Sequence, residues 1–198
     1  MKKKVALILN ILLIIFEVLG FIITYNTNDP LSPAYYTEDS NLICLVSSIL
    51  YVMYYLNGKS ANKTVHLLRF TATLNLLLTF FITLFLLSND YGLYEIMIHH
   101  EFLFFHTLCP IISFISYLFF EKYRSYKNNI MIKAPIFTFI YGGVVYLLNL
   151  LKVMHGPYSF LLVYEHSIAS TLITFIGMAI SIVIITFTLF EVKKKIKI

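Results

Sequence analysis

Residues 103–110, which read LFFHTLCP, contain the side chain that most strongly suggests chemistry. His106 lies inside an apolar run from Phe102 to Phe120. An ionisable residue within a membrane span is costly and usually faces the protein interior, which makes His106 a functional candidate. Pro110 has no N–H for the His106 carbonyl, so we expect the helix to bend there. Cys109 falls on roughly the same face, and a histidine that only bonds a neighbouring helix is the structural alternative.

A second polar group occurs in residues 35–41, which read YYTEDSN. Four residues of this region share helical spacing: Thr37, Ser40, Asn41 and Cys44. They occupy one face if a helix begins near Thr37, and the structural alternative is that Thr37 or Asp39 caps that helix. His106 lies roughly 6 Å below the outer end of its span by helix rise, a depth similar to that of Thr37. A hydroxyl and an imidazole at one depth can form a nucleophile–base pair.

Other polar residues have weaker signals. Glu17 lies roughly 12 Å below the outer end of its span by helix rise, and it could orient His106, pair with a cation or be protonated and hydrogen-bonded. We expect a structural or supporting role for it. Asn75 is typical of groups that bond between membrane helices. Because His106 is the only histidine buried in a predicted span and no zinc-type spacing occurs, the sequence predicts neither a metal nor another cofactor.

Composition defines the elements that must position these residues. The chain has 198 residues, of which 59% are hydrophobic and 13% charged, with a mean hydropathy of +0.82. This is too apolar for a soluble domain. Six apolar segments are long enough to span a hydrocarbon core, at residues 5–25, 41–56, 66–88, 102–120, 130–151 and 167–190. We therefore expect a polytopic membrane protein, an all-α bundle of six transmembrane helices forming a single domain over residues 1–198.

The basic residues predict the orientation of this bundle. All of them except Lys152 flank the same ends of the predicted spans. The positive-inside rule then places both termini in the cytoplasm, and we expect the first apolar segment to be a retained span. The net charge of +5 is thus a topology signal, which implies contact with the bilayer and no nucleic-acid partner. Both cysteines fall in predicted spans, so no disulfide framework is expected.

Several short motifs occur in order along the chain: Thr37-x-x-Ser40-Asn41-Leu42, Leu68-Arg69 followed by Thr73, Phe105-His106 with Pro110 and Ser113, Tyr141 with Tyr146, and Pro157-Tyr158-x-Phe160. Together they resemble the androgen-induced-gene family of six-span membrane proteins, including its small bacterial relatives. The resemblance covers about residues 37–160 and implies an intramembrane threonine hydrolase of a bacterial plasma membrane. Animal members of that family hydrolyse esters of fatty acids with hydroxy fatty acids, and their catalytic threonine and histidine map onto Thr37 and His106. The residues after Thr37 are far more polar here than in the animal pattern.

These observations predict a lipid ester hydrolase acting near the outer leaflet. Thr37 would attack the acyl carbonyl while His106 accepts its proton, and water would release the acyl group. Ser40, Asn41 or free N–H groups at the helix start are candidate oxyanion donors. The remaining pocket or supporting residues are Glu17, Cys44, Asn75, Cys109 and Tyr158.

Two alternatives stay open at this point. A related group of acyltransferases uses cysteine with histidine, which keeps Cys44 and Cys109 as candidate nucleophiles. A membrane protein without enzymatic activity could use the same polar pocket to bind or transport a lipid or another small molecule. The sequence sets no oligomeric state.

Overall fold

Helices dominate the computed structural model, which describes residues 1–26, 32, 34–122 and 129–196 and has no β-strand within them. The helices are α1 (Lys2–Asn26), α2 (Tyr36–Leu56), α3 (Lys63–Ile82), α4 (Ser88–Tyr91), α5 (Leu93–Met97), α6 (Cys109–Ile115), α7 (Asn129–Lys133), α8 (Ile136–Leu150) and α9 (Ile168–Ile196). The π-helical segments are η1 (Thr83–Leu87), η2 (Leu103–Leu108) and η3 (Ser116–Phe120), and η4 (Ser159–Leu161) is a 3₁₀ turn. Six helical stretches are long and apolar enough to cross a membrane. The predicted all-α, six-helix bundle of an integral membrane protein is therefore confirmed.

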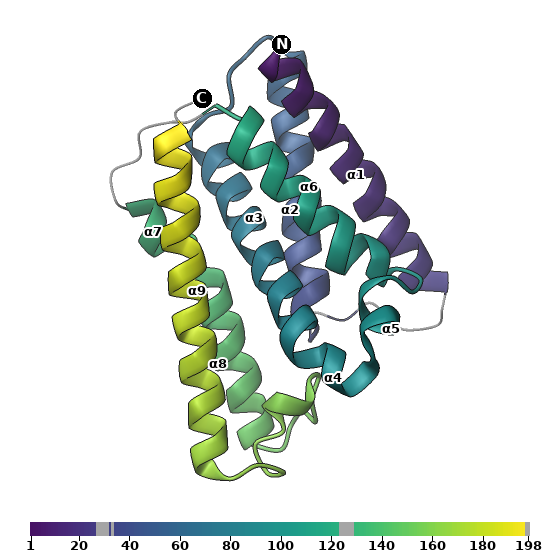
Figure 1. Cartoon of the computed structure of the whole chain (residues 1–198), viewed down its shortest axis with the longest axis vertical. Helices are drawn as coiled ribbons and strands as arrows, with labels where there is room; N and C mark the ends of the chain where they lie inside the picture. Colours follow the sequence, from purple (N-terminus) through teal and green to yellow (C-terminus); the bar gives the residue numbers. More distant parts are fainter. Residues whose placement is uncertain (27–31, 33, 123–128, 197–198) are drawn as a thin grey trace.

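α3 lies at the centre of this bundle, with α1, α2 and α6 on one side of it and α8 and α9 on the other (Figure 1). Its buried side chains Phe70 and Leu74 pack in one apolar cluster with Ile182 of α9. On another face, Ala72 and Leu76 pack in a second cluster with residues of α1, α2 and α6. α3 therefore supplies apolar surface to both halves of the bundle.

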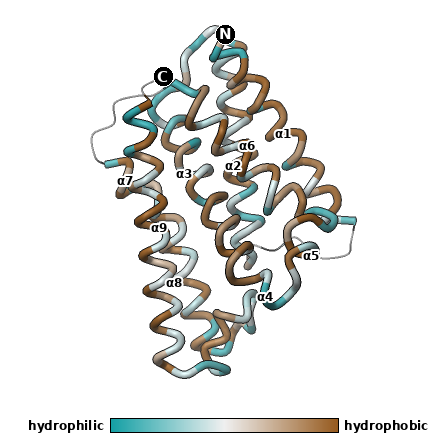
Figure 2. Tube along the Cα trace, viewed as in Figure 1, coloured by the Kyte–Doolittle hydropathy of each residue, from teal (hydrophilic) through white to brown (hydrophobic). Residues whose placement is uncertain are grey.

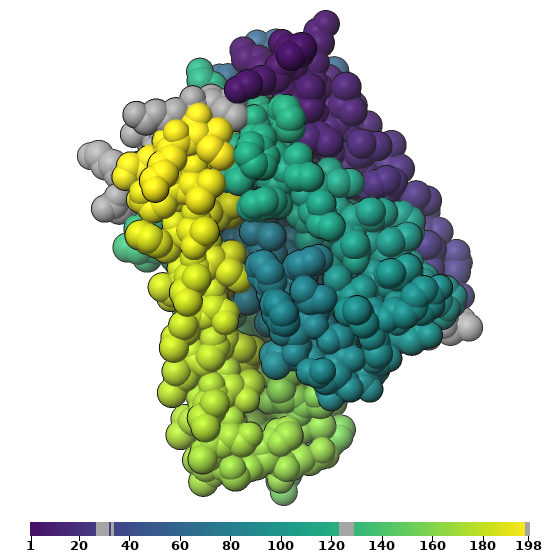
Figure 3. All heavy atoms as spheres, viewed as in Figure 1, coloured from purple at the N-terminus to yellow at the C-terminus, as the bar shows by residue number. Residues whose placement is uncertain are grey.

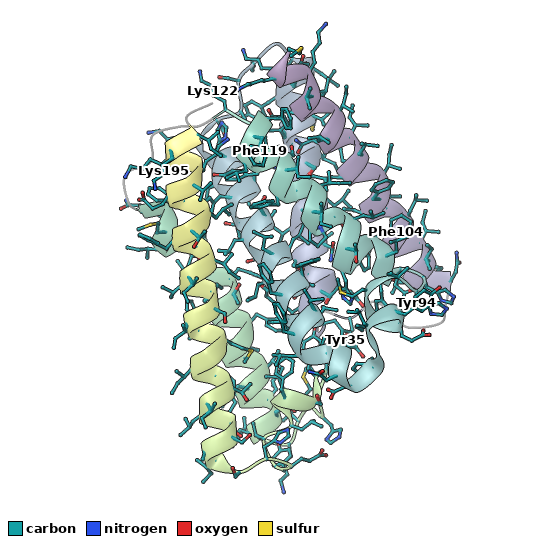
Figure 4. All side chains as sticks on the ribbon, viewed as in Figure 1. Tyr35, Tyr94, Phe104, Phe119, Lys122 and Lys195 are labelled. Atoms are coloured by element: carbon teal, nitrogen blue, oxygen red, sulfur yellow. The ribbon has the colours of Figure 1, made fainter. Side chains whose placement is uncertain are left out.

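The two ends of the bundle differ in the residues that they present. α1 begins and α9 ends at the same end, where the labelled Lys122 and Lys195 also lie (Figures 1 and 4). Tyr35 and Tyr94 lie toward the other end (Figure 4). Hydrophilic residues gather at the helix ends and connections, and apolar residues cover the long helices between them (Figure 2). This distribution matches the predicted membrane-spanning arrangement.

The first turn of α2 precedes the predicted apolar segment. α2 begins at Tyr36, before that segment starts at residue 41 and close to the helix start considered near Thr37, and no side chain caps the helix. The alternative in which Thr37 or Asp39 is the capping residue is therefore wrong. Tyrosine hydroxyls take that role from outside the helix. The Tyr141 hydroxyl accepts the N–H of Tyr36 at 3.1 Å, and the Tyr158 hydroxyl accepts the N–H of Thr37 at 3.4 Å.

Prolines shape two of the spans. Pro135 separates α7 from α8, because its ring nitrogen has no hydrogen to continue the helix. The fourth span adapts to Pro110 through η2, where the N–H of Cys109 bonds to the carbonyl five residues back. In this wider pattern, Pro110 leaves the carbonyl of Phe105 without its helical donor. Asn41 Nδ2 of α2 lies 3.5 Å from that oxygen.

A buried ion pair joins α3 to the end of η3. Arg69 Nη2 lies 2.9 Å from Glu121 Oε1, and both side chains are fully buried. Asn10 and Ser116 donate to the same oxygen at 3.2 and 3.0 Å. Lys193 of α9 donates to the Glu121 carbonyl. Arg69 therefore pairs inside the protein, and this polar cluster connects the helices on both sides of α3.

A lateral groove separates α9 from α3 and α6, and it is visible as a hollow between them (Figure 3). The corresponding cavity has a volume of about 660 Å³. Its walls are almost entirely apolar and include Phe81, Phe114 and Ile185. This groove contains neither Thr37 nor His106, so it is distinct from the site described next.

Candidate functional site

A second cavity brings the predicted nucleophile and base together. It has a volume of about 460 Å³, and Thr37, His106 and Tyr158 all line it. Its walls come from α1, α2, η1, α4, α5 and η2, and from the segments just before α2, η2 and η4. Tyr35, another lining residue, marks its position in Figure 4 toward the end of the bundle away from the termini.

The hydroxyl of Thr37 faces the imidazole of His106. Thr37 Oγ1 lies 3.2 Å from His106 Nε2, and His106 Nδ1 lies 2.6 Å from the carbonyl oxygen of Ile96. A carbonyl oxygen can only accept, so Nδ1 carries the proton and Nε2 presents its lone pair to the Thr37 O–H. The predicted proximity of the two side chains is therefore confirmed. The imidazole is also in the tautomer that can accept a proton from the hydroxyl.

The short helix α5 fixes the direction of the imidazole. Carbonyl groups in the last turn of a helix have no intrahelical donor, and those of Ile96 and Met97 accept from His106 Nδ1 and Thr107 Oγ1, both at 2.6 Å. The side chains of Ile96 and Met97 are buried. Phe102 stacks on the His106 ring, with centroids 5.0 Å apart and planes 6° from parallel. Packing and hydrogen bonding together hold the ring.

Two side chains from the next turn of α2 hold the backbone of Thr37. Ser40 Oγ and Asn41 Nδ2 donate to the Thr37 carbonyl at 2.9 and 2.7 Å. The Ser40 hydroxyl also lies 3.1 Å from that of Thr79 in α3. Neither Ser40 nor Asn41 lines the cavity. Their side chains therefore position the backbone of the threonine. Because both donate to the Thr37 carbonyl, the structure does not support their predicted use as oxyanion donors.

Tyr158 supplies a different donor. Its hydroxyl accepts the N–H of Thr37 at 3.4 Å, which leaves its own O–H to donate. Burial raises the pKa of Tyr158 to about 12, so the phenol keeps its proton at neutral pH. The Thr37 N–H belongs to the first turn of α2, where unpaired N–H groups and the helix dipole favour negative charge. The sequence placed Tyr158 in the pocket, and the geometry adds its hydrogen-bonding role.

Glu17 and the two cysteines form a separate group. Glu17 is fully buried in α1 and neighbours the thiols of Cys44 and Cys109, which are also buried. None of the three lines the cavity of Thr37. The alternative in which Glu17 orients His106 is wrong, because the Ile96 carbonyl occupies that position. Among the described residues, neither thiol forms a hydrogen bond with His106, so the arrangement favours threonine over cysteine as its partner.

Asn75 links helices behind the site. Its Oδ1 accepts from the Thr138 hydroxyl of α8 at 3.2 Å, and that hydroxyl lies 2.7 Å from the hydroxyl of Tyr36. This is the interhelical bonding predicted for Asn75. It supports the residue that precedes Thr37, and Asn75 does not line the cavity.

The part of the chain that the structure describes contains no group of three or more histidine, cysteine, aspartate or glutamate residues that could hold a metal ion. The chain matches no protein-family model, no curated protein and no solved structure.

Proposed function

We propose that this protein is an intramembrane threonine-type hydrolase of fatty-acyl esters. The observation that carries the proposal is the alignment of three groups in one cavity. The Thr37 hydroxyl lies 3.2 Å from His106 Nε2, and the opposite ring nitrogen lies 2.6 Å from the Ile96 carbonyl. A nucleophile, a base and a group that orients the base are the parts that covalent acyl transfer requires.

In the first half of the reaction, Thr37 Oγ1 attacks the acyl carbonyl carbon while His106 Nε2 accepts its proton. The carbonyl oxygen becomes an oxyanion, and the donors proposed to bind it are the Tyr158 O–H and the Thr37 N–H, which turns from the Tyr158 oxygen to the oxyanion in this step. Collapse of this intermediate breaks the ester bond, and His106 returns the proton to the departing alcohol oxygen. The products are an acyl-threonine ester and the free alcohol.

In the second half, a water molecule attacks the acyl-threonine carbonyl while His106 accepts one of its protons. The same donors bind the new oxyanion. Collapse releases the fatty acid, and His106 returns the proton to Thr37 Oγ1. The Ile96 carbonyl dipole supports the transient imidazolium, a role that a carboxylate has in the serine triad.

The membrane setting determines the substrate and the topology that we propose. An ester of a fatty-acyl amphiphile would place its acyl chain among apolar spans and its ester group near an interface. From the charge pattern, we propose that both termini are cytoplasmic and that the cavity faces the outer leaflet. The ordered motifs, through the resemblance, lead us to propose a bacterial plasma membrane. Cysteine introduced at Ser60 should then react only from the cytoplasm, and cysteine at Tyr91 only from outside. We also propose, on the ordered motifs, a relationship to the androgen-induced-gene family.

Labelling with a fluorophosphonate probe tests the proposed nucleophile. Wild-type protein in detergent should form one adduct, at Thr37. Thr37→Ala should abolish it, and His106→Ala should remove nearly all of it. The matched controls are Thr174→Ala, whose hydroxyl bonds only its own helix, and His155→Ala, whose side chain is 73% exposed. Both should label normally. An adduct that persists in Thr37→Ala would overturn the proposal.

Further variants separate this reaction from the alternatives. Cys44→Ala and Cys109→Ala should keep the adduct, whereas a cysteine–histidine acyltransferase would lose it in one of them. Thr37→Ser keeps a hydroxyl and should retain activity. The double variant of Thr37 and His106 should be little worse than either single variant, since each already breaks the same unit. A folded wild-type protein that never labels would indicate a lipid-binding or transport protein.

A further inference from the structure

The cavity that contains Thr37 also has an acidic wall. Glu38, Glu95 and Glu101 line it, and no lysine or arginine lines it within the described ranges. Two of these carboxylates have partners nearby. Glu38 Oε2 accepts the N–H of Ser32 at 2.8 Å, and Glu95 Oε2 lies 3.2 Å from His99 Nδ1.

Glu101 differs from the other two carboxylates. It is only 9% exposed, and its Oε2 has no hydrogen-bond partner among the described residues. Its backbone carbonyl accepts the N–H groups of Phe104 and Phe105, each at 3.0 Å, so the residue is fixed at the beginning of η2. A buried carboxylate without a partner is costly. Because Glu101 lines the cavity, a ligand that enters it can supply the partner that this carboxylate lacks.

Aromatic side chains share the cavity with this carboxylate. Phe102, Tyr35, Tyr91 and Tyr158 all line it. The rings of Tyr35 and Tyr158 meet edge to face, with centroids 6.2 Å apart. Aromatic faces attract ammonium groups, and cavities that bind quaternary ammonium ligands combine several such rings. An apolar wall beside an unpaired carboxylate is therefore complementary to an organic cation.

We propose that Glu101 and the surrounding rings bind a cationic head group, so that the substrates of this protein are amphiphiles carrying an ammonium or trimethylammonium group. That the bound amphiphile is a substrate rests on the proposed hydrolase function, whereas binding of the cation does not require hydrolysis. A cationic head group gives Glu101 the partner that it lacks, and a free carboxylate on the ligand would meet repulsion from the same wall. The preference for positive over negative head groups follows from both effects.

Binding in the full-length Thr37→Ala variant separates recognition from turnover. The protein is held in a neutral maltoside detergent, and four probes with one chain length are titrated: decyltrimethylammonium, decylammonium, decanol and decanoate. Each dissociation constant is measured by thermophoresis. We expect a cationic probe to bind about ten- to a hundredfold more tightly than decanol, and decanoate to bind most weakly. The tighter of the two cations identifies the head group as ammonium or trimethylammonium.

Substitution of Glu101 identifies the residue responsible. Glu101→Gln should weaken the cationic probe about tenfold and leave decanol unchanged. The matched control is Glu165→Gln, because Glu165 is an exposed carboxylate that does not line the cavity. It should change neither probe. Equal binding of decanoate and decyltrimethylammonium would overturn the proposal even if Glu101→Gln fails to fold.

The outcomes also distinguish this proposal from the proposed hydrolysis. Cation selectivity without any fluorophosphonate adduct would leave the head-group site standing and overturn the hydrolase. An adduct at Thr37 together with unchanged cation binding in Glu101→Gln would leave the hydrolase standing and overturn the head-group site.

Discussion

Tyr158→Phe is the substitution that most directly tests the proposed oxyanion donors. It removes one of the two donors and leaves the ring, which stacks on Phe160 with centroids 5.3 Å apart and planes 5° from parallel. The fold loses the 3.4 Å hydrogen bond from the Thr37 N–H. A bond of this kind contributes about 0.5–1.5 kcal/mol to stability, whereas loss of one oxyanion donor lowers kcat by about 10²–10³. Activity should therefore fall far more than stability.

The assay is hydrolysis of p-nitrophenyl decanoate in detergent, with thermal unfolding measured on the same preparations. The effect should fall on kcat more than on KM, because the donor interacts most strongly with the transition state. Tyr164→Phe is the matched control. Its hydroxyl also accepts a backbone N–H, that of Lys152 at 3.0 Å, outside the cavity. That variant should lose similar stability and keep its kcat.

The pH dependence of the free energy of unfolding gives an independent check on the same hydroxyl. Burial raises the pKa of Tyr158 to about 12, above the ordinary tyrosine value of about 10. Because the folded-state pKa is the higher one, the protonated phenol stabilises the fold fully below about pH 10, and this contribution is lost as the pH rises to about 12. Tyr158→Phe should lack that alkaline loss. A kcat within about threefold of wild type in the folded variant would refute the assignment of Tyr158 as a donor.

Three further substitutions probe the parts that support the site. Arg69→Leu should lower the free energy of unfolding by about 3–5 kcal/mol, because it leaves the Glu121 carboxylate buried without its cation. Gly20→Ala would place a Cβ 2.4 Å from the Phe105 ring, so thermal unfolding should reveal an overpacking cost of about 1–3 kcal/mol. Glu17→Gln should reduce ester hydrolysis less than loss of the histidine base, because Glu17 neighbours the two thiols and not the imidazole.

Two of these variants have matched controls, and the third has an outcome that would contradict it. Gly177→Ala on α9 meets no atom within 4 Å, so it should unfold at the wild-type temperature or slightly above it. Adding Glu121→Leu to Arg69→Leu should recover much of the lost stability, since the Glu121 carboxylate is then no longer buried without the Arg69 guanidinium. A double variant less stable than the single one would contradict the ion-pair argument. Abolished turnover in folded Glu17→Gln would place Glu17 in contact with the substrate.

The sequence predicted the spans well because hydropathy alone determines which segments can cross a membrane. Their ends were less accurate where polar residues continue a helix. Thr37 and Ser40 belong to α2, although the apolar signal begins only at residue 41. The division at Pro135 and the wider turns of η2 depend on local hydrogen bonding, which hydropathy does not describe.

The site was predictable only where it consists of side chains with distinctive chemistry. Helix depth was enough to bring Thr37 and His106 together. The orienting group was not predictable, because the acceptor at Ile96 is a main-chain oxygen that any residue carries. Glu101 looked like an ordinary acid at a span end, and only its burial and its unpartnered oxygen distinguish it from Glu95. The partner of Arg69 likewise depends on how η3 ends, since that places Glu121 inside the bundle.

The use of a peptide carbonyl to orient His106 has a consequence for the way this site tolerates genetic change. A codon change at Ile96 replaces the side chain but keeps the oxygen that accepts from Nδ1, so the apolar character of the position is its main constraint. Insertion or deletion of a residue between Leu93 and His106 would shift the register of that oxygen. A complete mutational scan should therefore find Ile96 permissive among apolar residues, and the stretch between Leu93 and His106 intolerant of any change in length.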